Sequence, residues 1–133
     1  DLKPLKIGEA NIINEESSEI VILYFGTLLN EANQISKELK ATLVDMRFVK
    51  PLDEKLLKKL FKKAKVFISI EDGSIMGGAG SAVQEFASKE NLNVRSILFG
   101  IPDKFIEHAS REEMLVEAGL DVENIKSKLS KLL

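Results

Sequence analysis

Four short apolar runs, separated by segments with helical periodicity, constrain the fold of this chain most strongly. The runs are EIVILYF (19–25), ATLVDM (41–46), KVFISI (65–70) and VRSILF (94–99). They are rich in β-branched and aromatic residues, and they are nearly continuous rather than alternating between apolar and polar. Strands of a parallel sheet that are covered on both faces have this pattern. We therefore expect four buried strands.

The segments between these runs carry apolar residues at the spacing of one helix face. The three sets are Leu28, Ala32, Ile35 and Leu39, then Leu56, Leu57, Leu60, Phe61 and Ala64, and then Ala79, Ala82, Val83, Phe86 and Ala87. Strand–helix–strand repetition predicts a parallel sheet with right-handed crossovers and helices on both faces. The expected fold is therefore a three-layer α/β/α domain.

The two ends of the chain add further elements. The segment KIGEANIIN (6–14) and the turn EESS predict a hairpin onto the first strand of the sheet, which makes a mostly parallel five-stranded sheet with one antiparallel edge strand. We expect residues 1–6 to be a linker and residues 7–133 to be the domain. Near the other end, SREE (110–113) is a capping box, Gly119 suits the end of that helix, and Asp121 can cap a last helix.

Composition excludes several classes of function. The formal net charge is −2 and no basic stripe with interleaved aromatics is present, so we expect no nucleic-acid partner. The apolar runs are too short to span a bilayer, so we expect no membrane partner. The sequence has no cysteine and one histidine, which removes disulfides, thiolate nucleophiles and Cys- or His-rich metal sites. A reducing cytoplasm fits this usage.

Ligand sites of open α/β sheets lie beyond the carboxyl ends of the strands. Four segments follow the predicted strands there: GTLLN (26–30), RFVKPLD (47–53), EDGSIMGGAGS (71–81) and GIPDKF (100–105). We expect residues of these segments, together with the nearby histidine, to contact a neighbouring domain or to hold an anion weakly. The candidates are Arg47, Lys50, Glu71, Asp72, Gly77, Gly78, Gly80, Ser81, Asp103 and His108.

The glycine-rich stretch fails two known phosphate motifs. The dinucleotide fingerprint ends on Gly or Ala, but Val83 stands at that position. A P-loop counted from Gly73 needs Lys and then Ser or Thr, where this chain has Ala79 and Gly80. An anion held by the amides of Gly80 and Ser81 remains an alternative, because free amides at a helix start attract anions.

A structural role explains the same stretch better. Its glycines permit close approach of the helix start to a strand or to a neighbouring chain. Glu71 or Asp72 can accept the first amides of that helix. Paired carboxylates hold Mg²⁺ only with further oxygen ligands, so we expect no metal. We expect Gly77, Gly78 and Gly80 to face a neighbouring domain or subunit rather than a substrate.

Two known functional arrangements do not fit the chain. A response-regulator receiver needs an acidic pair after its first parallel strand, where Gly26 and Thr27 stand. His108 lies within reach of Glu107 or Asp103 as a general base, but no Ser or Cys nucleophile has a recognisable setting. We therefore expect a structural or interface role for His108, and no catalytic residue in this chain.

Four stretches carry a resemblance to a known family. They are VDMRFVKPLD (44–53), EDGSIMGGAGSAVQEF (71–86), GIPDKFIEH (100–108) and EAGLD (117–121). They resemble the C-terminal domain of the 1-deoxy-D-xylulose-5-phosphate synthase family, which is transketolase-like and depends on thiamine diphosphate. The resemblance extends over the chain from Ile7 onward. Ala109 departs from the family, which usually has Gly after the His.

The resemblance implies a three-domain transferase of which this chain is the last domain. The full enzyme would join pyruvate to glyceraldehyde 3-phosphate with loss of CO₂, for isoprenoid, thiamine and pyridoxal synthesis. The family's Gly-Asp-Gly motif for Mg²⁺ and diphosphate, and its activating Glu, belong to the upstream domains. At 71–73 this chain has Glu71 in place of the first Gly.

The resemblance therefore implies that this chain binds neither thiamine diphosphate nor Mg²⁺ and is inactive alone. Its role would be to pack on the upstream pyrimidine-binding domain and to help build a cytoplasmic homodimer. Two alternatives remain open. One is an autonomous anion- or small-ligand-binding regulatory module that uses the amides near Gly78 to Ser81. The other is the C-terminal domain of a 2-oxo-acid dehydrogenase β subunit, against which RFVKPLD and GIPDKF argue.

Overall fold

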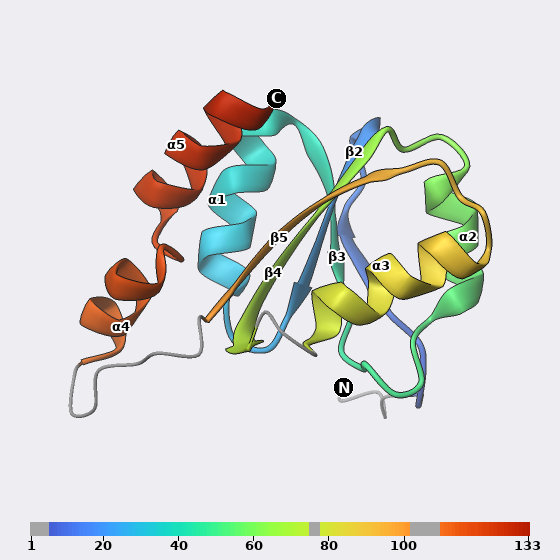
Figure 1. Cartoon of the computed structure of the whole chain (residues 1–133), viewed down its shortest axis with the longest axis horizontal. Helices are drawn as coiled ribbons and strands as arrows, with labels where there is room; N and C mark the ends of the chain where they lie inside the picture. Colours follow the sequence, from blue (N-terminus) through green and yellow to red (C-terminus); the bar gives the residue numbers. More distant parts are fainter. Residues whose placement is uncertain (1–5, 75–77, 102–109) are drawn as a thin grey trace.

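The computed structural model describes residues 6–74, 78–101 and 110–133. The sheet has five strands in the order β1-β3-β2-β4-β5 (Figure 1). The strands are β1 (Asn11–Asn14), β2 (Ser17–Phe25), β3 (Ala41–Asp45), β4 (Val66–Ser74) and β5 (Arg95–Ile101). β1 is antiparallel to its neighbour, and the other pairs are parallel. The four predicted parallel strands and the antiparallel edge strand are confirmed.

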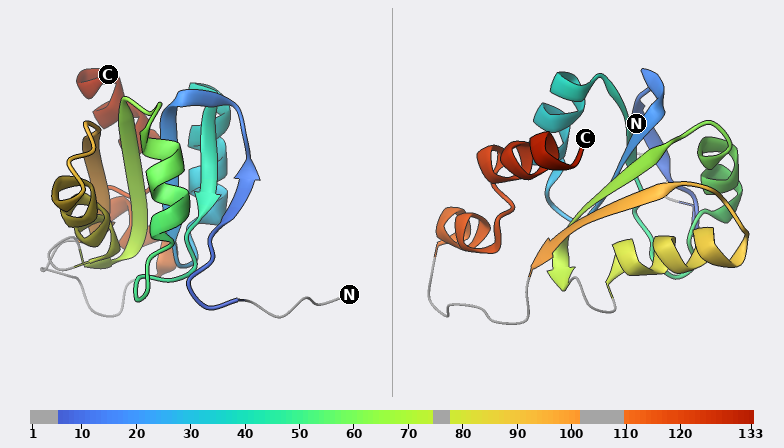
Figure 2. Two further views of the ribbon diagram at one scale, coloured as in Figure 1. Left: turned by 90° about the vertical axis from the view of Figure 1, so that its right-hand side faces the viewer. Right: turned by 45° about the horizontal axis from the view of Figure 1, so that its top comes forward.

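Helices cover both faces of the sheet, as the sequence predicted (Figure 2). One face packs against α1 (Leu29–Leu39) and α5 (Val122–Leu132), and residues of α4 (Arg111–Ala118) join that core. The other face packs against α2 (Glu54–Phe61) and α3 (Ala79–Lys89). Among the described residues, no helix has the length and apolar character needed to cross a membrane.

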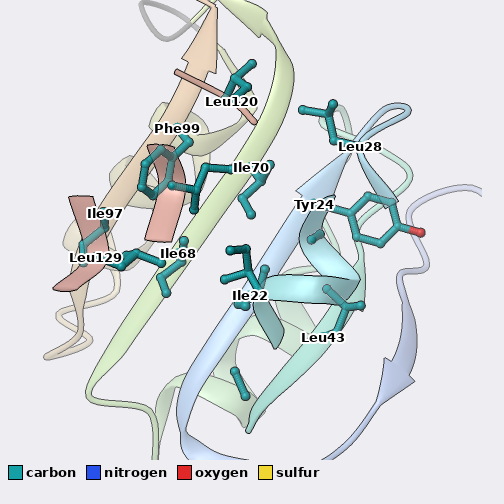
Figure 3. Packing of buried hydrophobic residues seen from close by; sticks show 14 of the residues in the cluster. Ile22, Tyr24, Leu28, Leu43, Ile68, Ile70, Ile97, Phe99, Leu120 and Leu129 are labelled. Atoms are coloured by element: carbon teal, nitrogen blue, oxygen red, sulfur yellow. The ribbon is translucent and has the colours of Figure 1, made fainter. Parts of the chain in front are cut away.

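Alternate residues of the central strands supply the two cores. In β2, Ile22 and Tyr24 face the α1 side, where they lie opposite Ile68 and Ile70 of β4 (Figure 3). Val21 and Leu23 face the α2 side. Because successive side chains of a strand point to opposite faces, a strand buried on both faces is apolar at most positions. This is why the strands are continuous apolar runs in the sequence.

The position of β1 differs from the sequence prediction. The N-terminal strand was expected to pair with the first strand of the parallel set, β2, but it pairs with β3, where Ile12 lies opposite Val44. Both edges of β2 are already occupied by β3 and β4, so β1 can add only at an outer strand, and it adds to β3. The buried Thr42 hydroxyl of β3 holds the turn that joins β1 to β2. It accepts a hydrogen bond from Glu16 N (3.1 Å) and donates one to Ser17 O (2.9 Å).

The predicted caps of the last two helices are present. Ser110 Oγ accepts a hydrogen bond from Glu113 N at 3.1 Å, and Asp121 Oδ2 accepts one from Asn124 N at 3.4 Å. Gly119 ends α4 with a φ of +72°, the left-handed conformation that glycine adopts without a Cβ penalty. These contacts set the boundaries of α4 and α5.

Candidate functional site

The described residues place most of the predicted site residues at the carboxyl edge of the sheet or in the first turn of α3. Arg47 and Lys50 lie in the loop between β3 and α2, and Glu71 and Asp72 lie near the end of β4. Gly78, Gly80 and Ser81 form the start of α3. The other three candidates, Gly77, Asp103 and His108, lie outside the described residues.

Glu71 caps α3 as the sequence predicted. Its Oε2 atom accepts hydrogen bonds from Ala79 N (2.7 Å) and Gly80 N (3.3 Å), and the residue is only 4% exposed. Burial raises the pKa of the Glu71 carboxyl; the two amides oppose that rise, and the charge of Asp72 adds to it. The carboxylate therefore occupies the place that an anion would take. An anion at the Gly80 amide would have to displace a buried side chain, which disfavours the predicted anion site.

Gly80 packs against its own sheet. It is buried, and a Cβ built on it would collide with Ser69 Oγ and lie 3.1 Å from Leu98 Cδ2. The helix start can approach β4 and β5 this closely because glycine has no side chain. The close approach of the helix start to a strand, one of the two expectations for this stretch, is therefore present at Gly80, and its own strands fill the space beside it. For Gly78, the half-buried N-cap of α3, contact with a neighbouring domain or subunit remains a prediction.

Asp72 holds the loop that follows β2. Its Oδ2 atom accepts hydrogen bonds from Thr27 N (3.1 Å) and Thr27 Oγ1 (2.8 Å). Gly26 has a φ of +90°, and a Cβ on it would collide with the Asp72 carboxylate. This role of Thr27 was not predicted from the sequence. A hydroxyl residue after one strand and an Asp after another were the available signal, but pairing them requires knowing that the two strands are neighbours.

A second polar cluster lies at the end of β3. Arg47 N donates to Asp45 Oδ1 (3.1 Å), and Arg47 Nε lies 3.9 Å from Asp45 Oδ2. Burial, together with the charge and hydrogen bond of Asp45, raises the pKa of Tyr24 to about 12, and Arg47 moderates the rise. Sequence reasoning identified Arg47 but not Tyr24 or Asp45, because a tyrosine in a β-strand is an ordinary core residue.

The first described residues lie against the loop between β3 and α2. Asp53 accepts hydrogen bonds from Leu56 N (3.1 Å), which caps α2, and from Ala10 N (2.8 Å). Gly8 has a φ of +78°, and a Cβ on it would lie 3.0 Å from Pro51 Cγ. The chain therefore enters the domain across this loop, at the carboxyl edge (Figure 1).

The chemistry of this edge is structural. Glu71, Asp72 and Asp53 each accept backbone amides of their own chain, so these carboxylates hold loops and helix starts. Among the described residues, no group of three His, Cys, Asp or Glu side chains is placed to hold a metal ion. These hydrogen bonds fix the loops of the carboxyl edge, so the edge has a defined surface that another domain can contact.

Comparison with known proteins identifies relatives over almost the whole chain. Residues 8–125 match the family model described as "Transketolase, C-terminal domain". The chain is 48% identical over 133 residues to a 1-deoxy-D-xylulose-5-phosphate synthase of Stutzerimonas stutzeri (strain A1501), covering 99% of the chain and 21% of the relative. It is 49% identical over 126 residues to the synthase of Blochmanniella floridana, covering 95% and 20%. The chain thus spans about a fifth of the length of these curated relatives.

Solved structures agree with this similarity. A structure described as a split gene transketolase, inactive beta4 tetramer, is 26% identical with a TM-score of 0.85, covering 96% of this chain and 43% of the other. The transketolase of Campylobacter jejuni is 18% identical with a TM-score of 0.60, covering 93% and 18%. The second similarity concerns the fold alone.

Proposed function

The chain belongs to the transketolase C-terminal domain family, and on that premise we propose that it is the last domain of a 1-deoxy-D-xylulose-5-phosphate synthase. One observation carries the proposal: the identity of 48% to a synthase over 99% of the chain. The relatives are about five times as long, which supports further domains in the same polypeptide. Residues 1–6 would then be the linker and residues 7–133 the domain.

The proposed activity belongs to the full-length enzyme. That enzyme joins pyruvate and glyceraldehyde 3-phosphate with loss of CO₂, and thiamine diphosphate with Mg²⁺ supplies the carbanion chemistry in the upstream domains. Glu71 and Asp72, the residues nearest to a diphosphate–metal motif, do not fit that group. Their oxygens already accept hydrogen bonds from Ala79, Gly80 and Thr27. We therefore derive no catalytic step from this chain.

The role of this domain in the proposal is structural. It packs on the upstream domains, supports a homodimer and acts in the cytoplasm of a bacterium like those of its relatives. Two features support this role: the carboxylates of the carboxyl edge hold loops, and Glu71 occupies the helix start where a regulatory anion would bind. The relatives at 48% and 49% identity are synthases, which supports this proposal over a 2-oxo-acid dehydrogenase β subunit.

A domain exchange tests the proposed function. This chain replaces the matching last fifth of the Pseudomonas aeruginosa synthase, to which it is 44% identical, and CO₂ release is measured with pyruvate and glyceraldehyde 3-phosphate. We expect the chimera to retain activity. The control chimera carries the C-terminal domain of the Campylobacter jejuni transketolase, which shares the fold at 18% identity, and we expect it to be inactive. An inactive test chimera that still folds would contradict the proposal.

Calorimetry tests the role of the isolated chain. Titration of the 133-residue chain with thiamine diphosphate and Mg²⁺ should give no binding heat, because its candidate carboxylates are already engaged. Micromolar binding would contradict a purely structural domain.

A further inference from the structure

The chain enters this domain at the carboxyl edge of the sheet. Asn11, the first residue of β1, lies opposite Asp45, the last residue of β3. Just before it, Ala10 N is bound to Asp53 Oδ2 at 2.8 Å. A domain that precedes this segment is therefore tethered beside the loop between β3 and α2. Tethering gives it a high effective concentration at this edge.

Exposed apolar residues gather at the same edge. Six large hydrophobic residues of the described part of the chain are exposed, and three of them lie here: Ile7 (78%), Leu29 (41%) and Val49 (36%). They come from three segments: the incoming chain, the start of α1 and the loop after β3. Single exposed hydrophobic residues are ordinary, but three of them at the edge where the chain enters indicate a covered surface.

Arg47 adds a partly exposed guanidinium to this edge. Its backbone has a φ of +59°, a conformation that L residues rarely adopt, and Asp45 holds both its amide and its guanidinium. Tyr24 also forms a side-chain hydrogen bond with Asp45. A guanidinium held in this way loses little freedom when it binds a carboxylate, which suits the polar rim of an interface.

From the entry of the chain and the exposed residues at this edge we propose that the carboxyl-edge surface, which includes Ile7, Leu29, Val49 and Arg47, is where the upstream domain of the same polypeptide packs. The matching surface has an apolar centre and a carboxylate opposite Arg47. This inference rests on the proposed function, because it requires an upstream domain. It goes further by assigning the face that is covered and the chain that covers it.

The absence of cysteine from the sequence provides a direct test. Val49→Cys and Leu29→Cys are made in the 133-residue chain and in the full-length protein, and alkylation of each site is followed by peptide mass spectrometry. We expect both sites to react about tenfold or more slowly in the full-length protein. Leu133→Cys is the control, because Leu133 is 51% exposed and lies at the other edge of the sheet. The carbonyl of its neighbour Leu132 accepts a hydrogen bond from Arg95, the first residue of β5. Leu133→Cys should react at similar rates in both proteins.

Other patterns of protection would overturn the assignment. Equal rates for Val49→Cys in the two proteins would remove the proposed interface. Protection of Val116→Cys alone would place the interface at α4, where Val116 is 57% exposed. Protection of Val49→Cys that disappears when the dimer dissociates on dilution would assign the cover to the partner subunit. An inactive full-length protein would contradict the proposed function, while the protection pattern still decides the surface.

A charge reversal tests the rim. Arg47→Glu in the full-length protein should raise the alkylation rate of Val49→Cys toward that of the isolated chain. Lys62→Glu, an exposed change at the C-terminal end of α2 and away from this edge, is the matched control and should leave that rate unchanged. Equal effects of the two changes would contradict a specific role for Arg47.

Discussion

Asp72 Oδ2 accepts two hydrogen bonds from Thr27, one from the backbone amide at 3.1 Å and one from the hydroxyl at 2.8 Å. The preceding residue, Glu71, instead bonds the first amides of α3. The helices α1 and α3 cover opposite faces of the sheet. Two consecutive carboxylates at the end of β4 thus fix the turn before α1 and the start of α3, which explains why both are acidic.

Removal of the Asp72 carboxylate should destabilise the domain. Asp72→Ala eliminates both hydrogen bonds to Thr27, and we expect a loss of about 1 kcal/mol, kept modest because the pair is exposed. Urea unfolding measures this loss. Glu85→Ala, an exposed change in the middle of α3, is the control and should stay within about 0.5 kcal/mol of the parent chain. Equal stabilities of the two variants would contradict the role of Asp72.

Gly26 and Gly119 form a matched pair for separating backbone strain from steric collision. Both have positive φ, but a Cβ on Gly26 meets Asp72, whereas a Cβ on Gly119 meets nothing within 4 Å. We expect Gly119→Ala to cost about 1 kcal/mol and Gly26→Ala about 1–3 kcal/mol more. Combining Gly26→Ala with Asp72→Ala should recover part of that difference. Additive effects in this double-mutant cycle would contradict the collision.

Gly80→Ala should destabilise the domain although alanine favours helices. The new Cβ would overpack against Ser69 Oγ and Leu98, which costs about 1–3 kcal/mol and outweighs a helix-propensity gain of about 1 kcal/mol or less. Ser69→Ala removes a hydroxyl oxygen that has no hydrogen-bond partner among the described residues, so alone it should be neutral or stabilising. In the double variant it should restore part of the lost stability. Thermal unfolding that shows Gly80→Ala to be stabilising would contradict the close packing.

Glu71 should give stability a pH dependence opposite to that of carboxylates whose pKa is lowered by ion pairs or hydrogen bonds. Burial raises its pKa in the folded state above the ordinary value of 4.5, so the folded chain binds the proton more tightly than the unfolded chain. The contribution of Glu71 to the free energy of unfolding therefore decreases as pH rises from about 4.5 through the folded-state pKa. Glu71→Gln removes this titration. The stability of the parent chain relative to Glu71→Gln should fall with rising pH in urea unfolding, and a rise would contradict the raised pKa.

Tyr24 is the only tyrosine, so the tyrosinate absorbance band reports on it alone. The native chain should ionise near pH 12, and the urea-unfolded chain near the ordinary value of 10.0. Because the folded-state pKa is the higher one, the stabilisation by neutral Tyr24 is complete below pH 10 and is lost as pH rises toward 12. Asp45→Asn should lower the native midpoint, since Asp45 contributes to the rise. An unchanged midpoint would exclude that contribution.

The sequence alone predicted much of the site. Glu71 or Asp72 was expected to cap the glycine-rich helix start from its place in the sequence, and the hydrogen bonds from Ala79 and Gly80 show that Glu71 does so. The Ser110 and Asp121 caps were predicted from local spacing and are also present. A cap joins residues close together in the chain, so local sequence contains the information.

The contacts that sequence reasoning missed join distant residues. Thr27 and Asp72 are 45 positions apart, and Ala10 and Asp53 are 43 apart. For Gly80, the sequence left open a strand or a neighbouring chain, because it does not specify how closely Ser69 approaches it. Each of these pairs depends on which strands are neighbours.

The sequence by itself determined the layered α/β class, the four parallel strands and the helix caps. These follow from periodicity and from short-range hydrogen bonding. Only the tertiary structure decided that β1 pairs with β3, that Asp72 holds Thr27 and that the incoming chain lies on Asp53. The physical reason is that the four apolar runs are nearly equivalent as strands. Their order in the sheet is set by packing of the whole chain, and that order selects the residues that meet at the carboxyl edge.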